Sequence, residues 1–201
     1  LYGADIALNG ALKVGNRLSL EATGQVNDSQ AITAKELLMR GAARFKLDVE
    51  TNNFDTVAAE DVGRLILVDK DDLTVGVLGK VSGVSSDGTV AITTRSGSLK
   101  LASKIATTDA SSSAIVLIAD EAKNAGDGTG GQVIVSTGAA LTTGAGGRSV
   151  LYTGSVADST GLTALVPSGS GRFRYNSDEA ETNYTTALGT GKYAIFREQP
   201  T

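Results

Sequence analysis

The chain of 201 residues carries 18 Lys and Arg against 22 Asp and Glu, a net charge of −4, and has no Cys, His or Trp. The negative balance argues against nucleic acid as a partner, because phosphate recognition needs clustered Lys and Arg. The absence of Cys excludes disulfides and thiolate zinc sites, and the absence of His removes the commonest general base and metal ligand. No apolar run approaches ~20 residues, so we expect no membrane span.

Short side chains dominate the composition. Ala, Val, Thr, Ser and Ile supply much of the bulk, whereas Phe and Tyr together number nine and Met occurs once. Repetitive β architectures suit such a chain, because each layer stacks on a near copy of itself and favours thin side chains. We therefore expect a repetitive β fold whose core is closed by thin side chains.

Alternating apolar and polar residues, separated by turn residues, predict a series of short strands along the whole chain. In chain order they are Asp5–Leu8, Arg17–Leu20, Glu36–Met39, Phe45–Val49, Gly63–Val68, Thr89–Thr93, Ser98–Leu101, Ala114–Ile118, Gln132–Ser136, Ser149–Tyr152 and Thr163–Val166.

Comparable strands start 16 to 20 residues apart. The intervals are 19 from Leu18 to Leu37, 16 from Leu99 to Ile115, 18 from Ile115 to Val133 and 17 from Val133 to Val150. A period of this size matches one coil of a three-sided β-helix. The expected fold class is all-β, a right-handed parallel β-helix, and we expect a monomer.

The segment Ala34–Arg40 leaves two interpretations open. It is rich in helix formers, and apolar residues at 34, 37, 38, 42 and 45 fit a helical stripe. We expect a strand, because Gly41 interrupts the run and the flanking segments resemble strands.

The composition changes near the carboxyl-terminal end. Between positions 126 and 171 lie 12 of the 25 Gly, whereas five of the nine aromatic residues follow Gly171. The ends of a solenoid have to be covered, because open strand edges pair with other chains. We therefore expect coils over 1–171 and a cap or junction over 172–201, in which Phe173, Tyr175, Tyr193 and Phe196 cover the last apolar layer.

Several phrases of the sequence resemble one family. Gly146–Val156 and Ser159–Leu162 are similar to the late β-helix region of filamentous-haemagglutinin-like exoproteins, the large adhesins that Gram-negative bacteria export by two-partner secretion. Phe173–Glu179 and Tyr193–Pro200 resemble the stretch that leads into the glycine-rich β modules of these proteins, and Asp69–Gly76 also fits. The resemblance covers roughly residues 55–201.

This resemblance implies a parallel β-helix on the bacterial cell surface. An outer-membrane transporter would be a partner during export, and extracellular polysaccharide or a host surface would be the partner afterwards. The amino-terminal secretion domain of the family is absent, so we expect that this segment does not direct its own export.

Glycine-rich and acidic motifs were weighed as sites. Gly126–Gly131 satisfies the G-x-G-x-x-G pattern, but a strand is expected after it where a dinucleotide site needs a helix, so a turn is expected. Gly189–Lys192 resembles a P-loop only faintly, since Tyr193 stands where Ser or Thr should hold magnesium. Asn27–Ser29 and Asn183–Thr185 match the short glycosylation acceptor pattern.

Acidic residues cluster as Asp69, Asp71 and Asp72, as Asp120 and Glu121, and as Asp178, Glu179 and Glu181. Two carboxylates can cleave a glycosidic bond if they are held ~5–9 Å apart, and many β-helix proteins act on polysaccharides. The signatures of such enzymes do not assemble here, since only Thr107–Asp109 and Asp71–Asp72 match fragments of them. We expect solvated turn carboxylates, no catalytic residue, no metal and no cofactor.

The expected function is that of a structural stalk in a large secreted or cell-surface bacterial adhesin that serves adhesion, aggregation or biofilm formation, and not that of an enzyme. The alternative is a β-helical polysaccharide-active enzyme or a polysaccharide-binding module. An ice-binding solenoid ranks last, because the Thr residues are not regularly spaced.

Overall fold

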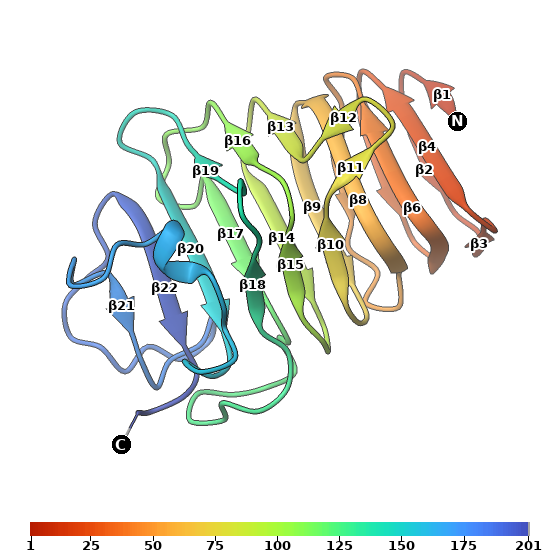
Figure 1. The fold of residues 1–201 in the computed structure, drawn as a ribbon. Helices are drawn as coiled ribbons and strands as arrows, with labels where there is room; N and C mark the ends of the chain where they lie inside the picture. Colours follow the sequence, from red (N-terminus) through yellow and green to blue (C-terminus); the bar gives the residue numbers. More distant parts are fainter. Residues whose placement is uncertain (201) are drawn as a thin grey trace.

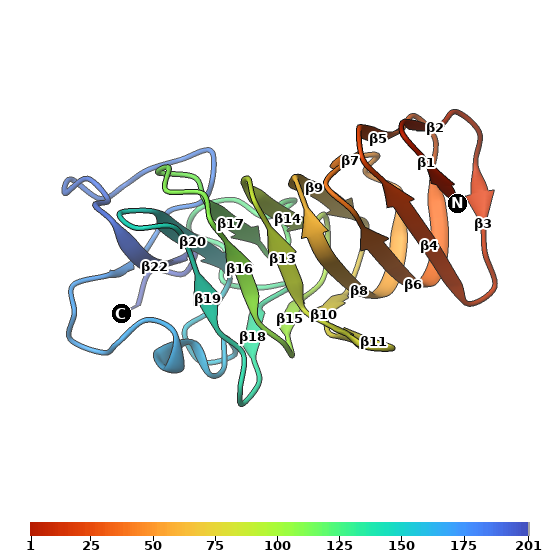
Figure 2. The ribbon, with the colours of Figure 1, turned by 90° about the horizontal axis from the view of Figure 1, so that it is seen from above.

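The computed structural model describes residues 1–200, which form an all-β stack of parallel strands with about nine turns and 2% helix. The coils follow one another along a rod from the amino to the carboxyl terminus (Figure 1). Strands of successive coils lie side by side along its whole length (Figure 2). The predicted fold class, an all-β parallel β-helix, is confirmed.

Two large parallel sheets form the walls of the rod. The first has eleven strands: β1 (Tyr2–Gly3), β3 (Leu12–Lys13), β4 (Arg17–Ala22), β6 (Ile32–Arg40), β8 (Asn53–Val62), β10 (Leu73–Val75), β13 (Val84–Ser86), β15 (Leu99–Leu101), β16 (Ile105–Thr107), β18 (Val133–Val135) and β19 (Leu141–Thr142). The second has nine: β2 (Ile6–Leu8), β5 (Gln25–Asp28), β7 (Arg44–Leu47), β9 (Arg64–Asp69), β14 (Val90–Thr94), β17 (Ile115–Ile118), β20 (Arg148–Thr153), β22 (Gly191–Phe196) and β21 (Phe173–Arg174).

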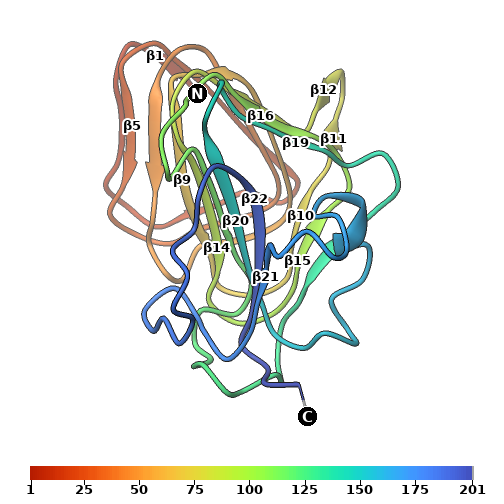
Figure 3. The ribbon, with the colours of Figure 1, turned by 90° about the vertical axis from the view of Figure 1, so that its left-hand side faces the viewer.

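The first sheet covers two sides of the rod, because β6 and β8 bend around a corner without a break. β6 pairs with β3 at Ile32 and Thr33 and with β4 from Glu36 to Arg40. In later coils, separate strands occupy these two sides, β15 and β18 on one and β16 and β19 on the other. The view along the rod shows these sides around the interior (Figure 3).

The coil length is correct in the first coils and wrong in the later ones. Leu18 lies opposite Leu37, so the predicted interval of 19 residues is confirmed. The other three intervals are wrong: Leu99 lies opposite Val133 and not Ile115, while Ile115 lies opposite Val90 and Ser149. Those intervals joined strands on different sides of the rod, because the later coils are longer than the predicted period.

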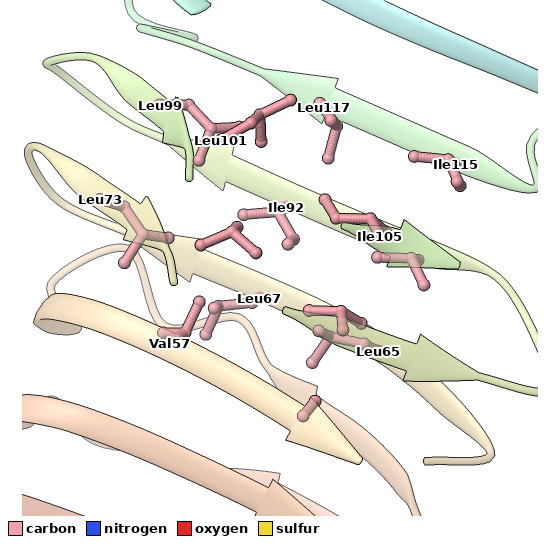
Figure 4. Packing of buried hydrophobic residues seen from close by; sticks show 14 of the residues in the cluster. Val57, Leu65, Leu67, Leu73, Ile92, Leu99, Leu101, Ile105, Ile115 and Leu117 are labelled. Atoms are coloured by element: carbon pink, nitrogen blue, oxygen red, sulfur yellow. The ribbon is translucent and has the colours of Figure 1, made fainter. Parts of the chain in front are cut away.

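Side chains of like kind stack in rows along the interior. One row of the second sheet runs from Val26 through Phe45, Leu65 and Val90 to Ile115. Figure 4 shows the rows of Leu, Ile and Val in the middle of the rod. Burying each of these side chains contributes about 1.5–3 kcal/mol, so the stacked rows stabilise neighbouring coils on each other.

The core is wider than predicted. Phe45, Phe54 and Met39 are fully buried in the first coils, together with many Leu side chains. The expectation that thin side chains close the interior is therefore wrong for this half of the rod, because the three sides enclose room for long side chains.

The segment Ala34–Arg40 is a strand, as predicted, and belongs to β6. Leu37 and Met39 point inwards, whereas Leu38 lies on the outer side and is nevertheless 4% exposed. The apolar residue on the outer side accounts for the helix-like pattern. Gly41 ends the strand with a φ of 84°, where an added Cβ would lie 2.4 Å from the Ala22 carbonyl oxygen.

An inserted hairpin covers Leu38. β11 (Val77–Leu78) and β12 (Val81–Ser82) pair antiparallel between β10 and β13, at the position where β8 runs without interruption in the coil before. A small apolar cluster of Leu38, Ala58, Leu78 and Val81 forms beneath the hairpin. The hairpin projects from the side of the rod in Figure 3.

Each predicted strand is present except the last, with ends shifted by a few residues. Thr163–Val166 is not a strand but overlaps a 3₁₀ turn, η1 (Leu162–Ala164), which follows Gly161 at a φ of 75°. Leu162, Leu165 and Val166 are buried, so the apolar pattern reports burial there and not extended backbone.

Buried polar residues line the corner at which the second sheet ends. Asn52 accepts a hydrogen bond from the Ile32 N–H at 2.8 Å and donates one to Asp28 at 2.6 Å. One coil further, Asp69 accepts from the N–H groups of Phe54 at 2.6 Å and Asp71 at 3.0 Å. These side chains satisfy main-chain donors that the corner removes from both sheet ladders.

The same corner continues towards the carboxyl-terminal end. Thr94 accepts a hydrogen bond from the Asp120 N–H at 3.0 Å, and Asp120 accepts one from the Gly131 N–H at 2.7 Å. Thr153 accepts one from the Val133 N–H at 2.8 Å. A polar row therefore runs along one corner of an otherwise apolar interior.

Candidate functional site at the carboxyl-terminal end

The strand order reverses at the end of the rod. β21 precedes β22 in the chain, yet β22 pairs with β20 over six residues and β21 lies beyond it. The segment after β21 stays along β22, because the N–H groups of Asn176 and Ser177 donate to the carbonyls of Glu198 and Phe196. The part of the chain predicted as a cap thus contains both the last long strand of the ladder and the edge outside it.

Three of the four predicted cap residues come together there. The ring of Phe196 stacks on Phe173 at a centroid distance of 6.0 Å and on Tyr175 at 5.5 Å. Phe196 is 3% exposed and joins the core, whereas Tyr175 is 38% exposed. The three rings therefore extend the apolar interior to the surface.

Tyr193 points to the opposite side of the sheet. Its ring lies between the guanidinium groups of Arg172 at 5.1 Å and Arg174 at 5.7 Å, and its hydroxyl accepts a hydrogen bond from the Gly189 N–H at 2.9 Å. Such cation–π contacts contribute about 0.5–2 kcal/mol each. The role of the four residues as a cap stays a prediction.

A pocket of about 320 Å³ opens beside the three rings. Its other wall is the segment between β20 and β21, which contributes apolar and hydroxyl-bearing residues. The lining consists of Val156, Ser159, Gly161, Leu162, Thr163, Ser168, Gly169, Phe173, Tyr175 and Phe196. Ring faces beside hydroxyl groups suit a small ligand with both apolar and polar faces.

A buried guanidinium fastens the loops around this end. Arg197 is fully buried and donates to three carbonyls, those of Ala119 at 2.5 Å, Gly131 at 3.0 Å and Asp127 at 3.3 Å. Burial lowers the pKa of Arg197, and nearby carboxylates, Asp120 foremost, oppose that shift. The side chain thus closes the long loop between β17 and β18 onto the end of β22.

A second network lies next to it. Gln132 donates to the carbonyls of Gly128 and Gly130 and accepts hydrogen bonds from the Ser155 N–H and the Ser159 hydroxyl. The motif Gly126–Gly131 is therefore a loop held by Gln132 and followed by strand β18, as predicted.

Sequence reasoning missed these two networks. Their acceptors are mainly main-chain carbonyls, which carry no residue signature, and those of Arg197 lie 66 to 78 positions away for its two terminal nitrogens.

The acidic residues are separated by their individual roles in turns. Asp72 accepts a hydrogen bond from the Ser98 N–H at 2.6 Å, Asp109 accepts one from the Ser111 N–H at 2.8 Å, and Asp71 forms an ion pair with Lys70 at 3.5 Å. Over residues 1–200, no three acidic side chains gather in a way that would hold a metal ion.

Burial raises the pKa of Asp69 to about 7, and hydrogen bonds from the Asp71 and Phe54 N–H groups limit that rise. Burial also raises the pKa of Glu179 and raises that of Tyr152 to about 12. Asp69 lies inside the corner row, so this shifted carboxyl belongs to the interior of the rod and not to the pocket.

The two glycosylation patterns lie on the surface. Asn27 is exposed on β5, and Asn183 is exposed but donates to the Asn176 carbonyl at 2.6 Å and to Glu181 at 2.8 Å. Among the described residues, no helix is long and apolar enough to cross a membrane.

The fold places this chain in the class of parallel β-solenoids. No family model, no curated protein and no solved structure matches the chain.

Proposed function

We propose that this chain is a structural stalk segment of a large secreted or cell-surface bacterial adhesin that mediates adhesion, aggregation or biofilm formation. The observation that carries the proposal is the unbroken ladder of the second sheet, which runs through nine parallel strands from one end of the rod to the other. At ~4.8 Å between neighbouring strands, such a ladder is about 40 Å long. The resemblance to filamentous-haemagglutinin-like exoproteins agrees with this function and with export by two-partner secretion.

The mechanism is reach. Each coil contacts only its neighbours, so a stack of coils lengthens without changing its cross-section and separates a binding module from the surface that carries it. Backbone hydrogen bonds and stacked apolar rows connect successive coils, and both resist bending of the rod.

One observation favours the alternative of a polysaccharide-binding module. The pocket beside Phe173, Tyr175 and Phe196 combines ring faces with the hydroxyls of Thr163 and Ser168. Aromatic rings stack on the apolar faces of sugars, whereas hydroxyls bind their polar edges. The dispersed turn carboxylates support binding and not cleavage as the function of such a module.

The test is made in the bacterium that produces the protein. Intact cells are treated with protease and probed with an antibody against this segment, and a strain with an in-frame deletion of codons for residues 32–69 is compared with its parent. We expect loss of the antibody signal on protease treatment and weaker attachment in the deletion strain, with export unchanged. An antibody signal that remains protected inside the cell overturns the proposal.

The enzymatic alternative has its own readout. The purified chain is incubated with neutral and acidic polysaccharides, and new reducing ends and unsaturated products are measured. We expect neither product. Cleavage that disappears in Asp71→Asn, Asp72→Asn or Asp109→Asn would establish the enzyme instead of the stalk.

A further inference from the structure

The outer face of the first sheet compensates its charges from coil to coil. Glu21 lies opposite Arg40, which lies opposite Glu60, and Arg40 and Glu60 form an ion pair at 3.3 Å. Arg17 lies opposite Glu36 and forms an ion pair with it at 2.6 Å. Opposite charges in register stabilise neighbouring strands, whereas like charges in register destabilise them.

The second sheet breaks this rule at one place. Arg44 begins β7 and lies directly opposite Arg64, the first residue of β9, and both side chains are exposed. In residues 1–200, neither guanidinium has a carboxylate within 4.0 Å. Arg64 donates through Nε to the Thr89 hydroxyl at 3.1 Å. Two like charges ~4.8 Å apart along the ladder therefore remain uncompensated within the chain.

The two arginines separate two surface hollows. On one side a hollow of about 270 Å³ is lined by both arginines with Gly63, Gly88, Thr89 and Asp109. On the other side a hollow of about 150 Å³ is lined by both with Gln25, Asn27, Phe45, Lys46 and Ile66. The acidic neighbours are already engaged, since Asp109 accepts the Ser111 N–H and Asp48 forms an ion pair with Lys46 at 3.1 Å.

A third arginine shows what this position binds when an acceptor is present. Arg148 is the first residue of β20, as Arg44 and Arg64 are of their strands, and it donates to the Leu188 carbonyl at 2.8 Å. The segment that supplies this acceptor lies at the carboxyl-terminal end. At β7 and β9 no segment of the described chain covers the arginines.

We propose that Arg44 and Arg64, with Lys46 and the amides of Gln25 and Asn27, bind the oxyanion groups of an acidic glycan that lies across β5, β7 and β9. This inference rests on the proposed function and names the class of ligand that the stalk contacts. A guanidinium pair binds a carboxylate or sulfate through charge-assisted, bidentate hydrogen bonds. The amides of Gln25 and Asn27 supply donors and acceptors for sugar hydroxyls.

The test measures binding of the whole chain by calorimetry at low ionic strength. The probes are polygalacturonate for carboxylate, dextran sulfate for sulfate, inorganic sulfate for the free anion, neutral dextran and single-stranded DNA. The site variant is Arg44→Gln with Arg64→Gln. The matched control is Arg17→Gln with Arg40→Gln, which removes the same charge from the first sheet. Circular dichroism and thermal melting check that both variants fold.

We expect polygalacturonate or dextran sulfate to bind, to weaken at least about tenfold in the site variant and to change less than about threefold in the control. Equal losses in both variants indicate attraction by net charge and overturn the site. Binding of inorganic sulfate alone, or of DNA as tightly as the acidic glycans, overturns the glycan assignment. Absence of binding to every probe overturns the inference but leaves the stalk proposal intact, because that proposal is tested by location and attachment.

Discussion

The amino-terminal coils repeat almost without variation, whereas the carboxyl-terminal coils grow longer and longer. Along the second sheet, Val26, Phe45 and Leu65 follow one another at intervals of 19 and 20 residues. Further along, Ile115 and Ser149 are 34 residues apart, and Ser149 and Lys192 are 43 apart. The ladder nevertheless keeps its register, so the added residues are accommodated in the turns.

The two halves close their turns by different means. In the amino-terminal half a single side chain, such as Asn52 or Asp69, binds the main chain at each corner. In the carboxyl-terminal half, Arg197 and Gln132 hold long loops through several carbonyls each. A short turn needs one acceptor, whereas a long loop needs a side chain with several donors to offset its greater conformational entropy.

The largest effect is expected from truncation after Gly171, which removes β21 and β22. The edge of β20 would become exposed and Leu151 would lose its neighbour Ala194 in the stack, so free backbone groups and apolar area would appear together. We expect a β-rich protein that aggregates, measured by circular dichroism and size-exclusion chromatography. A monomer with an unchanged melting temperature would show that the end segment is a linker and not a cap.

A charge placed in the interior rows should destabilise the rod by more than about 4 kcal/mol, because Val133→Arg or Ile115→Arg buries an unpaired charge. Both residues are fully buried. The matched control is Ile134→Arg, since Ile134 points outwards next to Val133 and is half-buried. Chemical denaturation measures the free energies of unfolding. Similar losses at 133 and 134 would contradict the inward register.

Removal of the Arg197 guanidinium should cost about 3–5 kcal/mol, because Arg197→Met leaves carbonyls and carboxylates without their donor. The matched comparison is Arg40→Met in the regular half, whose exposed ion pair contributes about 0–1 kcal/mol. Hydrogen exchange should also accelerate in the loop at residues 119–131 only in the Arg197 variant. Equal effects of the two substitutions would mean that long and short turns are held alike.

A pH dependence of about 2–4 kcal/mol is expected from Asp69 in the regular half. Its pKa is about 7 in the folded chain against 3.8 ordinarily, so the folded state keeps a proton that the unfolded state releases between those values. Stability should therefore fall as pH rises from about 4 to about 7 and then level off. Denaturation at several pH values measures the slope.

The variant Asp69→Asn should be less stable at low pH, because one of its two terminal atoms no longer accepts a main-chain N–H. It should also lose most of the slope between pH 4 and 7. An unchanged slope in this variant assigns the pH dependence to other carboxyls, such as Asp28 and Glu179, whose pKa values burial also raises.

Much of the fold follows from local patterns. The strand at Glu36–Met39 and the one at Gly63–Val68 show the two-residue alternation that a half-buried strand requires, and both are present. The site was less accessible to sequence reasoning. The aromatic residues after Gly171 pointed to the right end of the rod, but nothing in the sequence indicates that Phe196 stacks on Phe173 and Tyr175 while Tyr193 faces away.

The sequence by itself determined the strands, the turn positions rich in Gly and the parallel β-helix, because alternation and turn chemistry are properties of neighbouring residues. Only the tertiary structure decided which strands pair. Ile115 has near-equal spacings to strands on different sides of the rod, and the choice of Val90 and Ser149 as neighbours depends on the length of the intervening loops. The insertion of β22 inside β21 and the burial of Arg197 are decided in the same way, because both depend on contacts between segments far apart in the chain.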